Sequence, residues 1–206
     1  MTRLFVDIET IPGESKINEY IKKHSKLPEN VKTPSEIEQW LKDEYKKTSL
    51  DGDFGRIICI GLILDPPNKE TNVLTGPEPE ILKSFWEYAQ KADLFIAHNG
   101  FDFDFPFIYK RSCLNQIKPS RQINFARYRN DQIYDTMQEW NKWTFNKRIS
   151  FDKLAYILNL PSSKIQMDGS KVYDYYIDGK LTEIYDYCKR DVELLRKIYL
   201  KMTFQE

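Results

Sequence analysis

The chain has 206 residues, which suffices for one sizeable hydrophobic core and is short for two ordinary domains. Hydrophobic residues make up 41% of it, which predicts a folded globule. The 31 Lys and Arg balance 31 Asp and Glu, which excludes a uniformly basic protein that coats nucleic acid. Its three cysteines lie far apart and its histidines number two, so neither a disulfide framework nor a zinc site is predicted.

The first predicted element is a strand over residues 4–10, in which Phe5, Asp7 and Glu9 share one face and aliphatic residues share the other. Two like charges this close in a half-buried sheet are costly unless a cation lies between them. The pair therefore indicates a divalent metal site, with a solvent-facing strand edge as the alternative. Because the chain begins on a core strand rather than a leader, and no apolar run reaches membrane-spanning length, we expect a soluble, cytoplasmic protein.

A Lys- and Glu-rich segment with helically spaced apolar residues follows over about residues 14–48. A helix start is predicted at Thr33-Pro34, because Thr caps helices and Pro fits their first turn. We interpret the segment as a helical insertion or lid, with a surface excursion as the alternative.

Strands and helices then alternate along the rest of the chain. The pattern predicts strands over 56–64, 71–75, 94–98 and 133–136, and helices over 79–90, 104–114, 150–158 and 181–202. Strands first, then strands alternating with helices, indicate an α/β fold with a mixed central sheet flanked by helices. We take residues 1–206 as a single domain.

A second informative stretch spans residues 97–107, where a strand ends in Asn-Gly and a helix begins with acids and four phenylalanines. Asp102 and Asp104 thus lie at the carboxyl end of a strand, where ligands collect in open α/β sheets. The alternative is that one of them only caps the helix. The rings have two interpretations as well, as core packing or as a surface on which a base stacks.

A third stretch lies on the terminal helix. Tyr187 and Asp191 are four residues apart, so they share one face of that helix, one turn from each other. Asp191 lies among apolar residues, where a lone acid is expensive. The alternative is an exposed acid bonded to a Lys or Arg one turn away.

The region from Lys110 to Asn130 is locally basic. It contains six Lys or Arg and no acid, with Phe125 and Tyr128 interleaved. In a chain of zero formal charge this predicts a strip that binds a nucleic-acid backbone and stacks bases, with a solvated basic loop as the alternative.

In order, Asp7-x-Glu9, Asn99-x-x-x-Phe103-Asp104-x-Pro106 and Tyr187-x-x-x-Asp191 resemble the three exonuclease motifs of the DEDD superfamily, which has a ribonuclease H-like fold. The likeness is greatest to the Tyr-containing subgroup, and within it to the proofreading exonuclease domain of B-family DNA polymerases and its stand-alone relatives. Residues 56–61 and 167–172 look like the stand-alone group, so the resemblance covers most of the chain.

The resemblance implies a ligand set for two Mg²⁺ or Mn²⁺ ions, made of Asp7, Glu9, Asp104 and Asp191, with Tyr187 orienting the attacking water. Asp104 is preferred to Asp102 because a Phe immediately precedes it and a Pro follows two residues later. The expected nucleic-acid contacts are Asn99, Phe103, Arg111, Arg121, Arg127, Tyr128 and Arg129. Asp135 and Asp168 are expected to have structural roles, and the motifs assign none to residues 14–48.

The expected activity is therefore 3′-to-5′ exonuclease action, which hydrolyses phosphodiester bonds from the 3′ end of single-stranded DNA. A 3′-to-5′ exoribonuclease is the alternative, since nothing in the sequence reads a 2′-hydroxyl. From a different class, the chain is a catalytically inactive nucleic-acid-binding module of a replication or repair assembly, although the four acids and the tyrosine speak against it. The expected partners are the 3′ end of single-stranded DNA or RNA and a polymerase or repair complex, with no membrane.

Overall fold

The computed structural model describes residues 1–66, 69–126, 131–162 and 167–205. Its strands are β1 (Arg3–Ile11), β2 (Arg56–Asp65), β3 (Thr71–Thr75), β4 (Leu94–Ala97) and β5 (Ile133–Asp135). Its helices are α1 (Ile17–His24), α2 (Pro34–Lys47), α3 (Glu78–Ala89), α4 (Asp104–Leu114), α5 (Thr136–Trp140), α6 (Phe151–Ile157), α7 (Val172–Ile177) and α8 (Leu181–Met202), with short 3-10 turns at Thr48–Leu50 and Gly169–Lys171.

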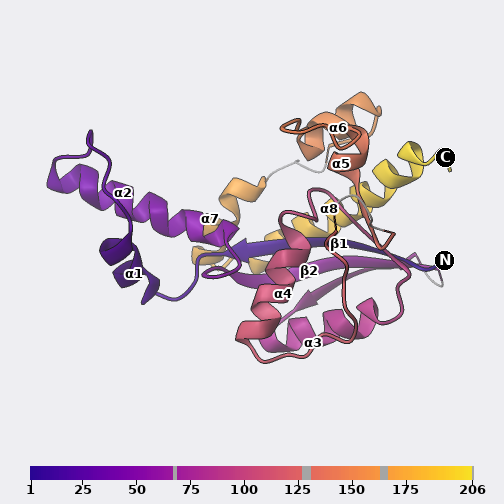
Figure 1. Ribbon diagram of the computed structural model, residues 1–206, viewed down its shortest axis with the longest axis horizontal. Coiled ribbons are helices and arrows are strands. Elements are labelled where there is room, and N and C mark those ends of the chain that lie inside the picture. Colours follow the sequence, from indigo (N-terminus) through magenta and orange to yellow (C-terminus); the bar gives the residue numbers. More distant parts are fainter. Residues whose placement is uncertain (67–68, 127–130, 163–166, 206) are drawn as a thin grey trace.

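The strands form one five-stranded sheet in the order β3-β2-β1-β4-β5, at the centre of Figure 1. β1 pairs antiparallel with β2, and β2 antiparallel with β3, whereas β4 runs parallel to both β1 and β5. The sheet is therefore mixed, and helices flank it. The predicted α/β fold with a mixed central sheet is confirmed.

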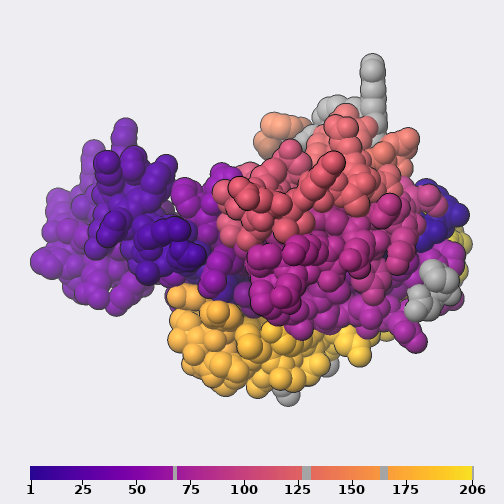
Figure 2. All heavy atoms as spheres, turned by 90° about the horizontal axis from the view of Figure 1, so that it is seen from below, coloured from indigo at the N-terminus to yellow at the C-terminus, as the bar shows by residue number. Residues whose placement is uncertain are grey.

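The alternation of β1 divides its side chains between two cores. Leu4, Val6 and Ile8 pack into the core that α3 and α4 cover, whereas Phe5 packs against residues of α8. Figure 2 shows these layers on opposite sides of the molecule, with magenta α3 on one side and the yellow terminal helix on the other. Asp7 and Glu9 share the face of Phe5, so they lie on the α8 side of the sheet.

The end of β5 differs from the sequence prediction. Thr136 was predicted to belong to the strand, but it begins α5, because the Asp135 carboxyl group accepts the Met137 and Gln138 backbone N–H groups as a helix cap. The short helices α5 and α7 were not predicted, since neither is long enough to show a helical period. Among the described residues, none of the helices is both long and apolar enough to cross a membrane.

Helices α1 and α2 form an arm that stands apart from the rest of the molecule in Figures 1 and 2. The predicted start of α2 is confirmed: Thr33 accepts the Glu36 backbone N–H, and the Glu36 carboxylate accepts the Thr33 N–H in return. None of the 14 described residues of α2 is buried. At its base the arm is tied down by the Tyr45 hydroxyl, which donates to the Gly13 carbonyl at 2.7 Å.

Candidate active site

Two of the predicted site residues come from the middle of β1. Asp7 lies opposite Gly61 of β2, and Glu9 lies opposite Cys59. The register shifts between Glu9 and Thr10, which is a bulge of the kind that often re-aims side chains beside functional sites. Glu9 is buried and Asp7 is half-buried, so neither is the solvent-facing acid of the alternative interpretation.

Asp191 and Tyr187 reach the same place from α8, and both are buried. Gly61 allows this approach, because a Cβ atom there would lie 2.9 Å from the Cys188 Sγ and 3.0 Å from its carbonyl oxygen. Burial raises the pKa of the Tyr187 phenol, and the charge of the neighbouring Asp191 carboxylate raises it further. The two side chains, one turn apart as predicted, therefore act as a unit that faces β1.

Asp104 joins from the first turn of α4. β4 pairs with β1 only as far as Phe5, so the backbone of β1 beyond it lacks a strand on that side. The Asp104 carboxyl group lies in this place, beside the backbone of Ile8. Asp104 is 3% exposed, whereas Asp102 is exposed, and only Asp104 lies with the other acids.

Burial raises the proton affinity of three of the carboxylates, those of Asp7, Glu9 and Asp104. Burial raises the pKa of Asp7 well above its ordinary value, and the charges of Asp191 and Asp104 raise it further. Burial and Asp7 raise the pKa of Glu9 in the same way, and burial raises the pKa of Asp104 to about 8. Ionising the whole cluster at neutral pH therefore requires a counter-charge.

A divalent cation fits this cluster. The Asp7 Oδ2 atom is buried and accepts no hydrogen bond from any described residue, which leaves it available as a ligand. The donors are carboxylate oxygens, which are the ligands that hard divalent ions prefer. The chain thus has residues suited to hold such metals. The candidate ligands are Asp7, Glu9, Asp104 and Asp191.

Cys188 is a neighbour that the sequence did not single out. Its Sγ atom and one oxygen each of Asp7 and Glu9 all lie within 4.8 Å of one another. A hydrogen bond with Cys59 and burial raise the pKa of the Cys188 thiol, so it stays protonated at neutral pH. Because thiolates rather than thiols bind metals, we assign Cys188 to packing between α8 and the sheet.

A cavity of about 460 Å³ opens onto the acids. Its walls include residues that the sequence analysis missed, among them Ser49, Leu50, His98 and Phe151. Ser49 and Leu50 end the segment that follows the arm, and the Thr10 hydroxyl fixes that segment by donating to the Ser49 carbonyl at 2.6 Å. Burial lowers the pKa of His98 to about 4, so it is neutral at physiological pH.

Two of the predicted nucleic-acid contacts lie at this cavity or beside it. Phe103 lines the cavity. Asn99 has a φ of 64°, a left-handed conformation that Asn adopts more readily than most residues, and its N–H donates to Asp135 at 3.0 Å. Its Oδ1 atom is buried without a hydrogen-bond partner among the described residues. Asp168 also lines the cavity, and it caps the turn at Gly169–Lys171 by accepting the Ser170 N–H.

The structure does not place all residues of the predicted basic strip on one nucleic-acid-binding surface. Arg111 is 12% exposed at its side chain and binds the Glu78 carboxylate through two hydrogen bonds of 2.9 and 2.7 Å, so it holds α4 to α3. Arg121 lies at a different pocket, where it donates to the Ala92 carbonyl. Arg127, Tyr128 and Arg129 lie outside the described residues.

Without divalent ions the protein is expected to lose stability as the pH rises from about 5 to about 9. The folded-state pKa values of Asp7, Glu9 and Asp104 exceed their unfolded values, so the folded chain binds more protons in this window and each rise in pH favours unfolding. Mn²⁺ should oppose this loss most strongly at the alkaline end, because it competes with protons for the carboxylates. Thermal melts with chelator and with Mn²⁺ test this, and a metal-free Tm that climbs across the window would contradict it.

Comparison with known proteins gives a family and a fold. A model of the family described as a predicted 3′-5′ exonuclease related to the exonuclease domain of PolB matches residues 50–206, a range that excludes Asp7 and Glu9. The structure resembles the family B DNA polymerase from the hyperthermophilic archaeon Pyrobaculum calidifontis, with a TM-score of 0.60 and 14% identity. The similarity covers 98% of this chain and 26% of that one, so the chain spans about a quarter of the polymerase's length.

No curated protein sequence matches the chain. The matched range extends over most of its length and includes Asp104, Tyr187 and Asp191. The chain therefore belongs to the family of predicted 3′-5′ exonucleases related to the exonuclease domain of PolB.

Proposed function

We propose that this chain is a metal-dependent 3′-to-5′ exonuclease that removes nucleotides from the 3′ end of single-stranded DNA. The observation that carries the proposal is the buried cluster of Asp7, Glu9, Asp104 and Asp191, which three separate elements supply. Burying like charges together costs folding free energy unless a positive charge lies among them.

In this proposal the four carboxylates hold two Mg²⁺ or Mn²⁺ ions. When bound there, such ions would supply the positive charge that activates an attacking water and stabilises the departing oxygen. The protein's part is to fix the ligands. β1 and α8 hold three of them rigidly, and the first turn of α4 holds the fourth, Asp104.

Tyr187 is the residue proposed to position the water. Burial and the charges of Asp191 and Glu9 raise the pKa of its phenol, so it remains protonated at any working pH and cannot serve as a base. A protonated hydroxyl beside Asp191 can still orient a water through its lone pairs. The chemistry then needs no covalent intermediate on the protein.

The substrate end would enter the 460 Å³ cavity, where Phe103 offers a ring for the terminal base, and Asn99, next in sequence to the lining residue His98, is the second proposed contact. We leave Arg111 out of the proposed contacts, because Glu78 occupies its guanidinium. The likeness to a DNA polymerase favours DNA. RNA is the second candidate, since no described residue of the cavity distinguishes a 2′-hydroxyl.

The test is incubation of 5′-labelled DNA and RNA strands with Mg²⁺ or Mn²⁺. A ladder of products shortened from the 3′ end is expected, and chelator should abolish it. A circular strand should stay intact, because it offers no end. If strands bind but remain full length with either metal, the chain is instead an inactive module that acts within a polymerase or repair assembly.

Tyr187→Phe should slow cleavage by about 10- to 100-fold without changing the Mn²⁺ requirement, because it removes one hydrogen bond to the water but no metal ligand. Cleavage rates at saturating strand and metal concentrations measure this. An unchanged rate would remove Tyr187 from the mechanism.

Substitutions of the two acidic residues of the second motif should differ clearly in their effect on cleavage. Asp104→Asn is expected to lower cleavage by at least about 100-fold, whereas Asp102→Ala should change it by less than about 3-fold. The reason is position: Asp104 is 3% exposed and lies near enough to Asp7 for its charge to raise the pKa of Asp7, while Asp102 is exposed. Single-turnover rates of both variants decide between them, and a larger loss in Asp102→Ala would reverse the assignment.

A further inference from the structure

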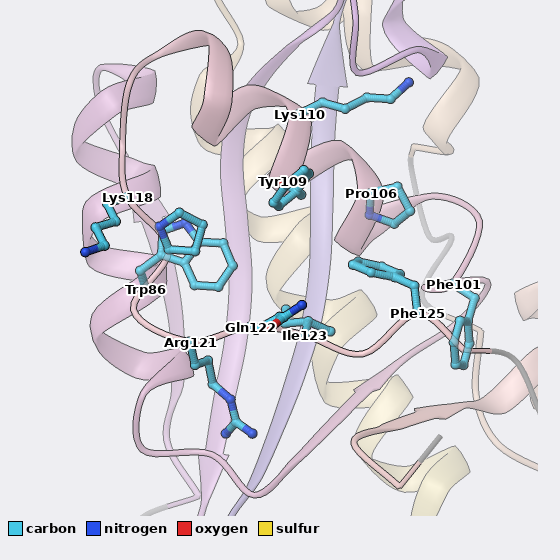
Figure 3. Close-up of a pocket in the computed structure, with 11 residues that line it drawn as sticks. Trp86, Phe101, Pro106, Tyr109, Lys110, Lys118, Arg121, Gln122, Ile123 and Phe125 are labelled. Atoms are coloured by element: carbon cyan, nitrogen blue, oxygen red, sulfur yellow. The ribbon is translucent and has the colours of Figure 1, made fainter. Parts of the chain in front are cut away.

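A second pocket, of about 930 Å³, lies between α3, α4 and the chain that follows α4. Figure 3 shows the rings of Trp86, Tyr109 and Phe125 around it. Its eleven lining residues are Trp86, Phe101, Pro106, Tyr109, Lys110, Lys118, Pro119, Arg121, Gln122, Ile123 and Phe125. They include four aromatic residues and none that is acidic.

The rings are available to a ligand. Tyr109 is 51% exposed and Phe125 is 39% exposed, so part of each ring is open to solvent. They come from different elements, Tyr109 from α4 and Phe125 from the segment after it, so a flat group could contact both. Nucleobases stack on exposed rings of this kind whatever their sequence.

The rim of the pocket is positively charged. Figure 3 shows the charged ends of Lys110, Lys118 and Arg121 pointing outward around it. Lys118 and Arg121 have no acidic partner among the described residues, and Arg121 is held in place by the Ala92 carbonyl and by the Phe95 ring, 5.3 Å from its guanidinium. Phosphates are the groups that such a rim attracts.

The pocket adjoins the candidate active site. Phe101 and Pro106 line the pocket, and Phe103, which lies between them in sequence, lines the cavity of the acids. On the other side, Lys110 pairs with Asp51 and Asp53, at 3.5 and 2.9 Å, and Asp51 directly follows the cavity residue Leu50. A continuous strand can therefore reach one site from the other around the start of α4.

We infer that this pocket binds the nucleotides of a single strand that lie on the 5′ side of the 3′ end being removed, with bases against Tyr109 and Phe125 and phosphates at Lys118 and Arg121. This inference rests on the proposed function, which places the 3′ end among the four carboxylates. It assigns the pocket a role in holding the strand during successive removals. Tyr109 and Phe125 are binding residues here and touch no reacting atom.

The test compares strands of about 20 nucleotides, which reach the pocket, with strands of about 3, which do not. Tyr109→Ala and Phe125→Ala are each expected to raise KM for the long strand by about 10-fold and to leave kcat unchanged. Neither should change KM for the short strand. Tyr156→Ala, which removes an 82% exposed ring on α6, is the matched control. It should have the wild-type KM for both the long and the short strand.

Affinity measured without turnover separates this inference from the proposed function. Fluorescence anisotropy of the labelled long strand in chelator should show the same loss for Tyr109→Ala and Phe125→Ala, and Lys118→Glu should also flatten the salt dependence. If the ring variants lose strand affinity but the wild type cleaves no strand, strand binding at the pocket would be supported and the proposed nuclease activity refuted. Wild-type affinity and wild-type KM in both ring variants would overturn the inference.

Discussion

Replacing Asp7 by Asn is expected to lower the rate of strand cleavage by at least about 1,000-fold, which corresponds to about 4 kcal/mol of transition-state stabilisation. Asp7 is central to the proposed cluster, since its pKa responds to both Asp191 and Asp104 and its Oδ2 atom has no hydrogen-bond partner among the described residues. Asn keeps the shape of the side chain but supplies no negative charge. Rates over a series of Mn²⁺ concentrations measure the loss.

The same variant carries its own control for folding. Because burial and neighbouring acids raise the pKa of Asp7, its ionised form opposes folding at neutral pH when no metal is bound. Asp7→Asn should therefore melt at a higher temperature than the wild type in chelator, by about 2 to 4 °C for each kcal/mol of repulsion removed. An inactive variant that also melts lower would point to damage of the fold instead of loss of a ligand.

Asp135→Ala is expected to destabilise the protein by about 4 kcal/mol or more. The Asp135 side chain is fully buried, and its carboxyl oxygens accept four backbone N–H groups, those of Asn99, Phe101, Met137 and Gln138, at 3.0 to 3.2 Å. Alanine leaves all four donors buried without an acceptor. Chemical denaturation measures the change, together with a fall in Tm of about 8 to 16 °C.

Asp135 should matter for activity only through this structure. It fixes the turn from Asn99 to Phe101, which precedes Phe103 and Asp104 at the candidate site. Cleavage by Asp135→Ala should consequently recover in part at low temperature, where the variant is folded. Asp102→Ala, which changes an exposed acid in the same turn, is the matched control and should leave stability within about 0.5 kcal/mol. Equal stability of the two variants would contradict this account.

The parts of the fold that a local period encodes were predictable from the sequence. The two-residue alternation of β1 places Asp7 and Glu9 on one face, and the four-residue spacing places Tyr187 and Asp191 together on α8. The Thr33 cap of α2 is a local signal as well. In these places a few neighbouring residues determine the backbone conformation, so the local sequence is sufficient to predict it.

The remaining features depend on residues that are distant in sequence. Asp104 reaches the acids because β4 pairs with β1 only as far as Phe5 and leaves room for it beside β1, which no local pattern reveals. Arg111 looked like a member of a basic strip, but Glu78, 33 residues away, binds it. The pocket of Tyr109 and Phe125 likewise forms only when the segment after α4 folds back along α3.

The central claim is that four carboxylates gather to hold two divalent ions. Counting the Mn²⁺ ions bound per chain, by electron paramagnetic resonance of free Mn²⁺ during a titration, tests it most directly. Two ions are expected to bind to the wild type, and fewer to the folded Asp7→Asn and Asp191→Asn variants. A folded wild-type chain that binds no Mn²⁺, or variants that bind as many ions as the wild type, would contradict it.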